Sequence, residues 1–207
     1  MTGGRRLVLL RHGRTAWNDV GRAQGHADVG LDPTGHAQAA GVAPYLAALR
    51  PRALWTSDLA RARQTCAYLE RATGLVAVAD ARLREYDVGA RQGMTAAEFA
   101  SAFPEAHARW RAGQDMAPVP GAELAPDVEA RMLPALEACL EALAPGESGI
   151  VVTHGAALKV GLLALLGWPQ SQASALRGVE NCAWATVAEV ARGGRVRLAG
   201  YNEHVRH

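Results

Sequence analysis

The chain has 207 residues and a mass of 21.8 kDa, a length that suits one globular domain with at most a small appended lobe. Hydrophobic residues make up 49% of it and charged residues 20%, so the chain can bury a core and is not disordered by composition. Its formal net charge of +2 is too small to indicate binding to nucleic acid or to a membrane surface.

Cys66, Cys139 and Cys182 are widely spaced along the chain. An odd number of scattered cysteines indicates buried thiols in a reducing compartment, not a disulfide framework. The first apolar run, residues 7–10, is too short for a signal peptide. The longest run, residues 156–166, contains a lysine and cannot span a bilayer. We therefore expect a soluble cytoplasmic protein.

Apolar runs and amphipathic segments alternate along the chain and predict strands and helices in turn. Asp32 and Pro33 mark a helix start, because aspartate caps free amides and proline suits the first helical position. Gly74 and Gly167 are typical helix ends. The predicted strands cover residues 7–10, 53–56, 76–79, 149–153, 182–190 and 195–198, the last two joined by a Gly193–Gly194 turn. The predicted helices run from Pro33 to Leu49, from a cap at Ser57 or Asp58 to Thr73, from Thr95 to Phe103, from Pro104 to Gly113, from Asp127 to Leu143 and from Ala156 to Leu166.

Strands that alternate with helices predict one α/β domain over residues 1–207, with three α/β/α layers around a mixed, mostly parallel sheet. The irregular segment at about residues 86–121 is expected to be a small helical insertion over the site. In such folds ligands bind beyond the carboxyl ends of the strands. Two histidine–glycine turns occupy that position: His12-Gly13 after the first strand, with Arg11 beside it, and His154-Gly155 after a later one.

Each candidate residue also has a structural alternative. A lone histidine in a loop is more often solvated than catalytic, and His154 could simply be hydrogen-bonded in its turn. The helix that begins directly after His154 nevertheless has a free N-terminus, which is a typical anion site. Arg61 lies in the first turn of a helix, where a cation is unfavourable unless it faces a bound anion; the alternative is an ion pair with Asp58. Glu85, taken alone, is best explained as the partner of an arginine.

Taken together, four motifs resemble the histidine phosphatase superfamily, the phosphoglycerate-mutase-like proteins, nearly from end to end. Their order and approximate spacing are more specific than any one of them. The motifs are Leu7-Val8-Leu9-Leu10-Arg11-His12-Gly13 with Thr15, Trp17 and Asn18; Thr56-Ser57-Asp58-Leu59 with Arg61 and Ala62; Leu83-Arg84-Glu85 with Gly89 and Gly93; and Val151-Val152-Thr153-His154-Gly155.

The resemblance implies a role for each matching residue. His12 corresponds to the nucleophile and Glu85 to the general acid. The residues that correspond to the phosphoryl-binding groups are Arg11, Arg61 and His154, helped by Asn18. Thr15, Gln24 and Gly25 match positions near the phosphate or substrate. The histidines show no zinc-ligand spacing, so we expect neither metal nor cofactor.

The resemblance implies a metal-independent phosphomonoesterase that acts on a small phosphorylated metabolite through a phosphohistidine. One alternative is a cofactor-dependent phosphoglycerate mutase, although the segment from Glu85 to His154 is short for one. The other is a non-catalytic phospho-ligand binder, which would be expected to lack the nucleophile or the acid. Arg91 stands where relatives often carry tryptophan, which leaves the substrate open and points to more acidic phosphoesters. Dimers are common among relatives, but no apolar face of this sequence requires a homodimer.

Overall fold

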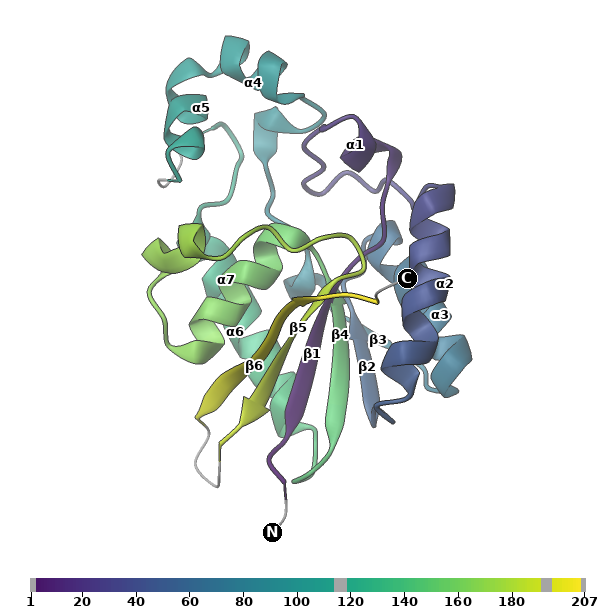
Figure 1. Ribbon diagram of the computed structural model, residues 1–207. Helices are drawn as coiled ribbons and strands as arrows, with labels where there is room; N and C mark the ends of the chain where they lie inside the picture. The colour runs from purple at the N-terminus through teal and green to yellow at the C-terminus, as the bar shows by residue number, and fades with distance from the viewer. Residues whose placement is uncertain (1–2, 114–118, 191–194, 206–207) are drawn as a thin grey trace.

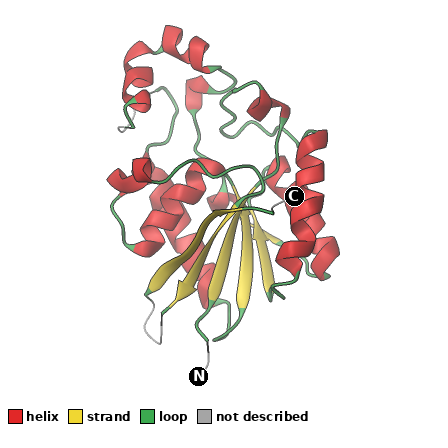
Figure 2. Cartoon of the chain, viewed as in Figure 1, coloured by secondary structure: helices red, strands yellow, loops and turns green. Residues whose placement is uncertain are grey.

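The computed structural model describes residues 3–113, 119–190 and 195–205. Three layers form its body, a central sheet with helices on both faces (Figures 1 and 2). The strands are β1 (Arg6–Arg11), β2 (Ala53–Thr56), β3 (Val78–Ala79), β4 (Ser148–Thr153), β5 (Trp184–Glu189) and β6 (Val196–Glu203). In the sheet their order is β3-β2-β4-β1-β5-β6; β1 to β4 pair in parallel, and β5 and β6 are antiparallel. The predicted α/β/α fold is confirmed.

The helices pack their apolar sides on the two faces of the sheet. Helices α2 and α3 cover one face, and α6 and α7 cover the other (Figure 1). The α-helices are α1 (Ala16–Asp19), α2 (Pro33–Ala47), α3 (Ala60–Thr73), α4 (Ala96–Ala102), α5 (Pro104–Arg111), α6 (Ala125–Glu141) and α7 (Gly155–Leu166). Three short 3₁₀ helices are η1 (Ala81–Leu83), η2 (Gly89–Arg91) and η3 (Gln170–Ala175).

The starts of α3 and α6 differ from the predicted ones. Neither Ser57 nor Asp58 caps α3, whose N-cap is Leu59 without a side-chain cap. Asp58 instead accepts a two-pronged hydrogen bond from Arg84. The α6 helix begins two residues before the predicted Asp127, because that side chain accepts from the amide of Leu124. Residues 193–194, the predicted hairpin turn, lie outside the described residues.

The register of the two central strands fixes the place of the site. In the parallel pair of β1 and β4, Arg11 lies opposite Thr153. Each strand is followed directly by one of the two histidines, so His12 and His154 leave the same edge of the sheet side by side. The centroids of their rings are 5.2 Å apart. The sheet thus brings together two residues that are far apart in sequence.

Helices α4 and α5 stand above this edge of the sheet, next to α1 (Figure 1). They enclose a small core of their own around Phe99, Ala106 and Val119, separate from the two cores on the faces of the sheet. This group, which we call the cap, lies within the segment predicted to be an insertion.

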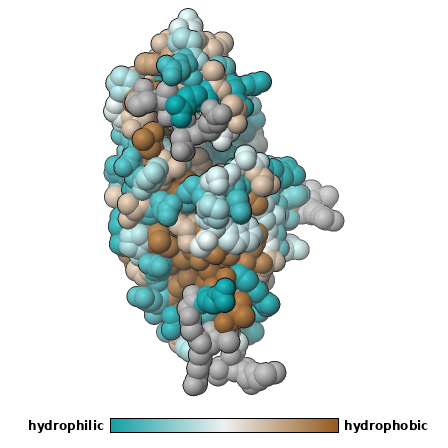
Figure 3. Space-filling model, turned by 90° about the vertical axis from the view of Figure 1, so that its left-hand side faces the viewer, coloured by the Kyte–Doolittle hydropathy of each residue, from teal (hydrophilic) through white to brown (hydrophobic). Residues whose placement is uncertain are grey.

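The outer surface includes an apolar area. Seen from the side of β6 and α7, apolar side chains gather on the lower half of the molecule, away from the cap (Figure 3). The sequence did not single out such a face, and the homodimer remains a prediction. Among the described residues, no helix has the length and apolar character that a membrane span requires. All three cysteines are free and buried, as predicted.

Candidate active site

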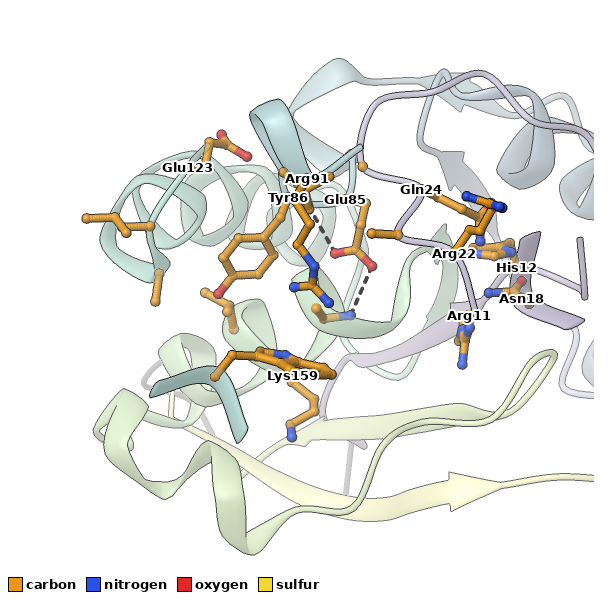
Figure 4. A pocket seen from close by; sticks show the side chains of 18 of the residues that line it. Arg11, His12, Asn18, Arg22, Gln24, Glu85, Tyr86, Arg91, Glu123 and Lys159 are labelled. Carbon is orange, nitrogen blue, oxygen red and sulfur yellow. Dashed lines mark hydrogen bonds between the residues drawn. The ribbon is translucent and has the colours of Figure 1, made fainter. Parts of the chain in front are cut away.

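A cavity of about 420 Å³ lies at the carboxyl edge of the sheet, between the residues that follow β1 and the cap residue Trp110. The wall includes seven of the nine predicted site residues: Arg11, His12, Asn18, Gln24, Gly25, Arg61 and Glu85. The other two, Thr15 and His154, are fully buried behind the wall. The structure therefore gathers the predicted set around one space, although Thr15 and His154 do not face it. Figure 4 shows how Arg11, His12, Asn18, Gln24 and Glu85 lie around the cavity.

His12 is held in one orientation by the backbone. The side chain is only 2% exposed, and its Nδ1 lies 2.7 Å from the carbonyl oxygen of Gly13. A carbonyl can only accept, so Nδ1 carries the proton and Nε2 keeps its lone pair. Burial, followed by the charges of Arg11 and Arg61, holds the pKa of His12 well below its usual range. The neutral, nucleophilic form of the ring is therefore favoured.

His154 uses both ring nitrogens inside the protein. The Nε of Arg61 donates to Nδ1 at 3.1 Å, and Nε2 lies 2.8 Å from the Oγ of Ser57. Because Nδ1 accepts, Nε2 carries the proton and donates to the serine. Burial and then the charge of Arg61 lower the pKa of His154 well below its usual range. In this geometry the ring orients Arg61 and does not itself face the cavity.

Arg61 is the largest fully buried side chain of the described residues. Its Nη1 and Nη2 each donate at 2.8 Å, to the carbonyls of Ala27 and Gly25. A guanidinium has five N–H groups, so two remain beyond these bonds and the bond to His154. Burial lowers the pKa of Arg61 to about 10, where the group is still a cation near pH 7. The predicted alternative, an ion pair with Asp58, is not what the structure shows.

Arg11 and Asn18 complete the inner end of the cavity. Arg11 donates to the carbonyl of Val179 at 2.6 Å, and its buried Nε has no hydrogen-bond partner among the described residues. The Oδ1 of Asn18 accepts from the amide and the hydroxyl of Thr15 and from Asn181. Its amide nitrogen is therefore the end that can serve a ligand. Thr15 acts indirectly, because its hydrogen bonds orient the side chain of Asn18.

Glu85 lies at the start of α7. Its Oε1 accepts from the amide of Ala157 at 2.8 Å, and its Oε2 from that of Ala156 at 3.1 Å. These are free amides of a helix whose N-cap, His154, provides no side-chain cap. The helix start that was predicted as an anion site is occupied here by the carboxyl group of Glu85, which comes from another segment. The contact points Glu85 into the cavity (Figure 4).

Three residues that the sequence analysis did not assign to the site support the backbone of Glu85. The carbonyl of Glu85 accepts from Arg131 and from His26, both at 2.8 Å. Arg131 also makes a two-pronged ion pair with Glu123. Glu123 and Arg131 are eight residues apart and face each other across the start of α6. No local pattern in one sequence marks such a pair.

The outer half of the cavity is lined by residues around the cap. Arg91, where the family resemblance implied an aromatic residue, stacks its guanidinium 4.4 Å from the ring centroid of Phe99 and 4.6 Å from that of Trp110. Trp110 also lines the cavity, with Tyr86 and Lys159. Burial lowers the pKa values of Arg91 and Lys159 from their usual ones. In the described parts of the chain, no three His, Cys, Asp or Glu side chains are grouped to hold a metal ion.

Comparison with known proteins gives one consistent result. The family model of the histidine phosphatase superfamily, branch 1, matches residues 7–203. A glucosyl-3-phosphoglycerate phosphatase of Mycobacterium tuberculosis (strain CDC 1551 / Oshkosh) is 38% identical over 192 residues, covering 89% of this chain and 85% of that protein. A protein of Yersinia enterocolitica named probable phosphoglycerate mutase is 35% identical over 185 residues, covering 87% of this chain and 83% of that protein.

The solved structures are similar throughout their length. A mycobacterial glucosyl-3-phosphoglycerate phosphatase in complex with VO3 superposes with a TM-score of 0.87 at 35% identity, covering 96% of this chain and 98% of that one. A Bacillus stearothermophilus protein superposes with the same TM-score of 0.87 at 28% identity, covering 97% of this chain and 98% of that one.

Proposed function

The chain belongs to the histidine phosphatase superfamily and is a phosphomonoesterase, and we propose that it works through a phosphohistidine formed on His12. The observation that carries the proposal is the hydrogen bond from Nδ1 of His12 to the carbonyl of Gly13. Nε2 is therefore unprotonated, and a nitrogen that attacks phosphorus needs this free lone pair. The guanidiniums of Arg11 and Arg61 lie nearby. The site residues and their roles below are part of this proposal.

In the first step, Nε2 of His12 attacks phosphorus and the bond to the ester oxygen breaks. Glu85, which enters this step protonated, gives its proton to the leaving oxygen, so an alcohol departs and a phosphohistidine remains. In the second step, a water oxygen attacks phosphorus, its proton returns to Glu85, and the N–P bond breaks to release inorganic phosphate. One ester and one water thus become one alcohol and one phosphate.

The cations bind the oxygens on which negative charge is concentrated during both steps. Arg11 and Arg61 supply N–H groups at the inner end of the cavity, and the amide nitrogen of Asn18 supplies a neutral donor. His154 fixes the guanidinium of Arg61 from behind. A rigid, buried arrangement matters because phosphoryl transfer depends mainly on positioning and electrostatics. A related mycobacterial structure holds VO3, an oxyanion comparable with phosphate, which supports an oxyanion site on this fold.

Glucosyl-3-phosphoglycerate is the first natural substrate to test, because a relative that is 38% identical to this chain is named a glucosyl-3-phosphoglycerate phosphatase. The alternative of a phosphoglycerate mutase draws support only from relatives such as the Yersinia protein. The two activities separate cleanly when 3-phosphoglycerate is supplied with a bisphosphoglycerate primer. We expect phosphate release without formation of 2-phosphoglycerate.

The experiment that tests the proposal compares the wild type with His12→Ala on p-nitrophenyl phosphate, with EDTA present throughout. We expect the variant to lose at least about 10³-fold in kcat/KM, and a thermal melt to show that it is folded. The matched control is His36→Ala, which changes a histidine of α2 that bonds to Tyr68, outside the cavity. Comparable turnover by a folded His12→Ala protein would exclude His12 as the nucleophile.

A further inference from the structure

The outer half of the cavity contains a cation that the proposed chemistry does not use. Lys159 is the only lysine of the chain and lines the cavity from α7. We propose that Lys159 binds a second anionic group of the substrate, a carboxylate on the alcohol that leaves. The inference rests on the proposed function, since it needs a phosphoester bound at His12.

Among the described residues, the ammonium group of Lys159 has a neutral hydrogen-bond acceptor and no charged partner. Its Nζ donates to the carbonyl of Leu176 at 2.8 Å. An ammonium has three N–H groups, so two remain beyond this bond. Within the described residues, no carboxylate lies within ion-pair distance of Nζ. A partly buried cation that meets only a carbonyl is an incomplete site for an anion.

The acidic residues of the cavity wall are both engaged elsewhere. Glu85 accepts from the amides at the start of α7. Glu123 accepts from Arg131 and from the amide of Asp87. Neither carboxylate is therefore placed to neutralise Lys159. The anion that completes the site has to come with the ligand.

The place of Lys159 on α7 decides which part of the ligand it meets. It is three residues beyond Ala156, whose amide holds Glu85, and so lies on nearly the same side of the helix about 4.5 Å further along the axis. Glu85 is the proposed proton donor to the leaving oxygen. The proposal therefore assigns the ammonium to the alcohol part of the ester and not to the phosphoryl group.

The surroundings favour an acidic alcohol. In Figure 4, Lys159, Arg91 and Tyr86 lie on one side of Glu85, and Arg11, His12 and Asn18 lie on the other. The phosphoryl group occupies the side of His12, and a carboxylate near the bridging oxygen of the ester extends towards Lys159. The guanidinium of Arg91 adds positive potential to the same half of the cavity.

A pair of ligands that differ mainly in one carboxylate tests the proposal: 3-phosphoglycerate and glycerol 3-phosphate. Their inhibition constants are measured against hydrolysis of p-nitrophenyl phosphate, so neither ligand needs to be turned over. We expect the wild type to bind 3-phosphoglycerate about tenfold more tightly, as a charge-assisted hydrogen bond provides. In Lys159→Met the ratio should fall to near one through weaker binding of 3-phosphoglycerate, and Lys159→Arg should restore most of it.

The control variant is Arg63→Met, which removes an exposed cation outside the cavity and should leave the ratio unchanged. Equal affinity of the wild type for both ligands would overturn the inference, as would an undiminished ratio in Lys159→Met. An equal loss of affinity for both ligands in Lys159→Met would also overturn the inference, because it would indicate a purely structural role for the lysine. Absence of p-nitrophenyl phosphate hydrolysis in the wild type would instead reject the proposed function itself.

Discussion

Arg131 donates a hydrogen bond of 2.8 Å to the carbonyl of Glu85, and the same guanidinium bonds to the carbonyls of Arg82 and Arg84. One side chain of α6 therefore holds three carbonyls of the segment that carries the proposed acid. Glu123 fixes the guanidinium in turn. The position of Glu85 over the cavity depends on this arrangement as well as on α7.

Replacing Arg131 should impair acid catalysis selectively. In Arg131→Met the backbone of Glu85 loses a charged donor, and a misplaced acid affects poor leaving groups most. We expect kcat on an alkyl phosphate such as glycerol 3-phosphate to fall at least tenfold more than kcat on p-nitrophenyl phosphate. Arg131→Lys should not rescue the defect, because an ammonium cannot reproduce the planar fork. Equal losses on both esters would instead indicate a general effect on folding.

Replacing Glu85 should separate the two chemical steps. Glu85→Gln cannot protonate a leaving group or accept a proton from water. With p-nitrophenyl phosphate the first step needs little acid, so the phosphoenzyme should form and then persist. We expect a burst of about one p-nitrophenolate per enzyme, followed by slow steady-state turnover. A labelled phosphoryl group should be trapped on the protein and should be lost in acid. Glu105→Gln, an exposed residue of α5, should show wild-type steady-state kinetics.

The two buried histidines should make the protein less stable in acid. Their folded-state pKa values lie well below the ordinary value of about 6.5. Below that value the unfolded chain binds more protons than the folded one, so stability falls as the pH falls. Between about pH 7.5 and pH 5.5 each histidine should contribute a loss of about 1.4 kcal/mol. Urea unfolding at both pH values measures this loss. In His12→Gln the free energy of unfolding should fall by about 1.4 kcal/mol less than in the wild type. An identical pH dependence of the two proteins would contradict a lowered pKa of His12.

A side chain at Gly25 should strain the loop that carries it. It has a φ of +53°, and a Cβ there would lie 2.5 Å from Cγ2 of Val88. Its carbonyl also accepts from Arg61, so a shift of this loop disturbs the phosphoryl site. Gly25→Ala should lower stability by about 1–2 kcal/mol and raise KM severalfold. The double variant with Val88→Ala should recover part of both, because the contact is relieved while the backbone strain remains. Full wild-type behaviour of Gly25→Ala would show that the loop is not constrained.

Much of the fold could be predicted because the signals are local. Leu7–Leu10 and Ile150–Val152 are continuous apolar runs, and buried parallel strands need such runs. Asp32 caps α2 through the amide of Gly35 at 2.7 Å, and Gly74 takes the left-handed conformation at the end of α3. Each of these features depends on a few neighbouring residues. The predicted β3 was too long at its start because the two observed residues, Val78 and Ala79, pair only with the short β2.

The site could be predicted in its membership but not in its contacts. The motifs identified Glu85, yet the nearby arginines suggested a salt bridge, whereas in the structure its carboxyl group accepts from two amides of α7. The sequence also placed His154 against the ligand, whereas Ser57 and Arg61 engage both of its nitrogens. Contacts between distant segments leave no periodic trace: Arg131 lies 46 residues from Glu85, and Lys159 lies 17 residues from Leu176. Arg131 and Lys159 therefore could not be assigned to the site before the fold was known.

β1 is paired on both sides, with β4 and with β5, and the nucleophile follows it directly. The amides of β1 should thus exchange with deuterium only when the whole domain unfolds. The cap has a separate core of three buried residues and should open at a much lower free energy. Mutations that retune the choice of ester can therefore accumulate in the cap with little penalty to the domain, while the phosphorus chemistry stays anchored to the segment that opens last.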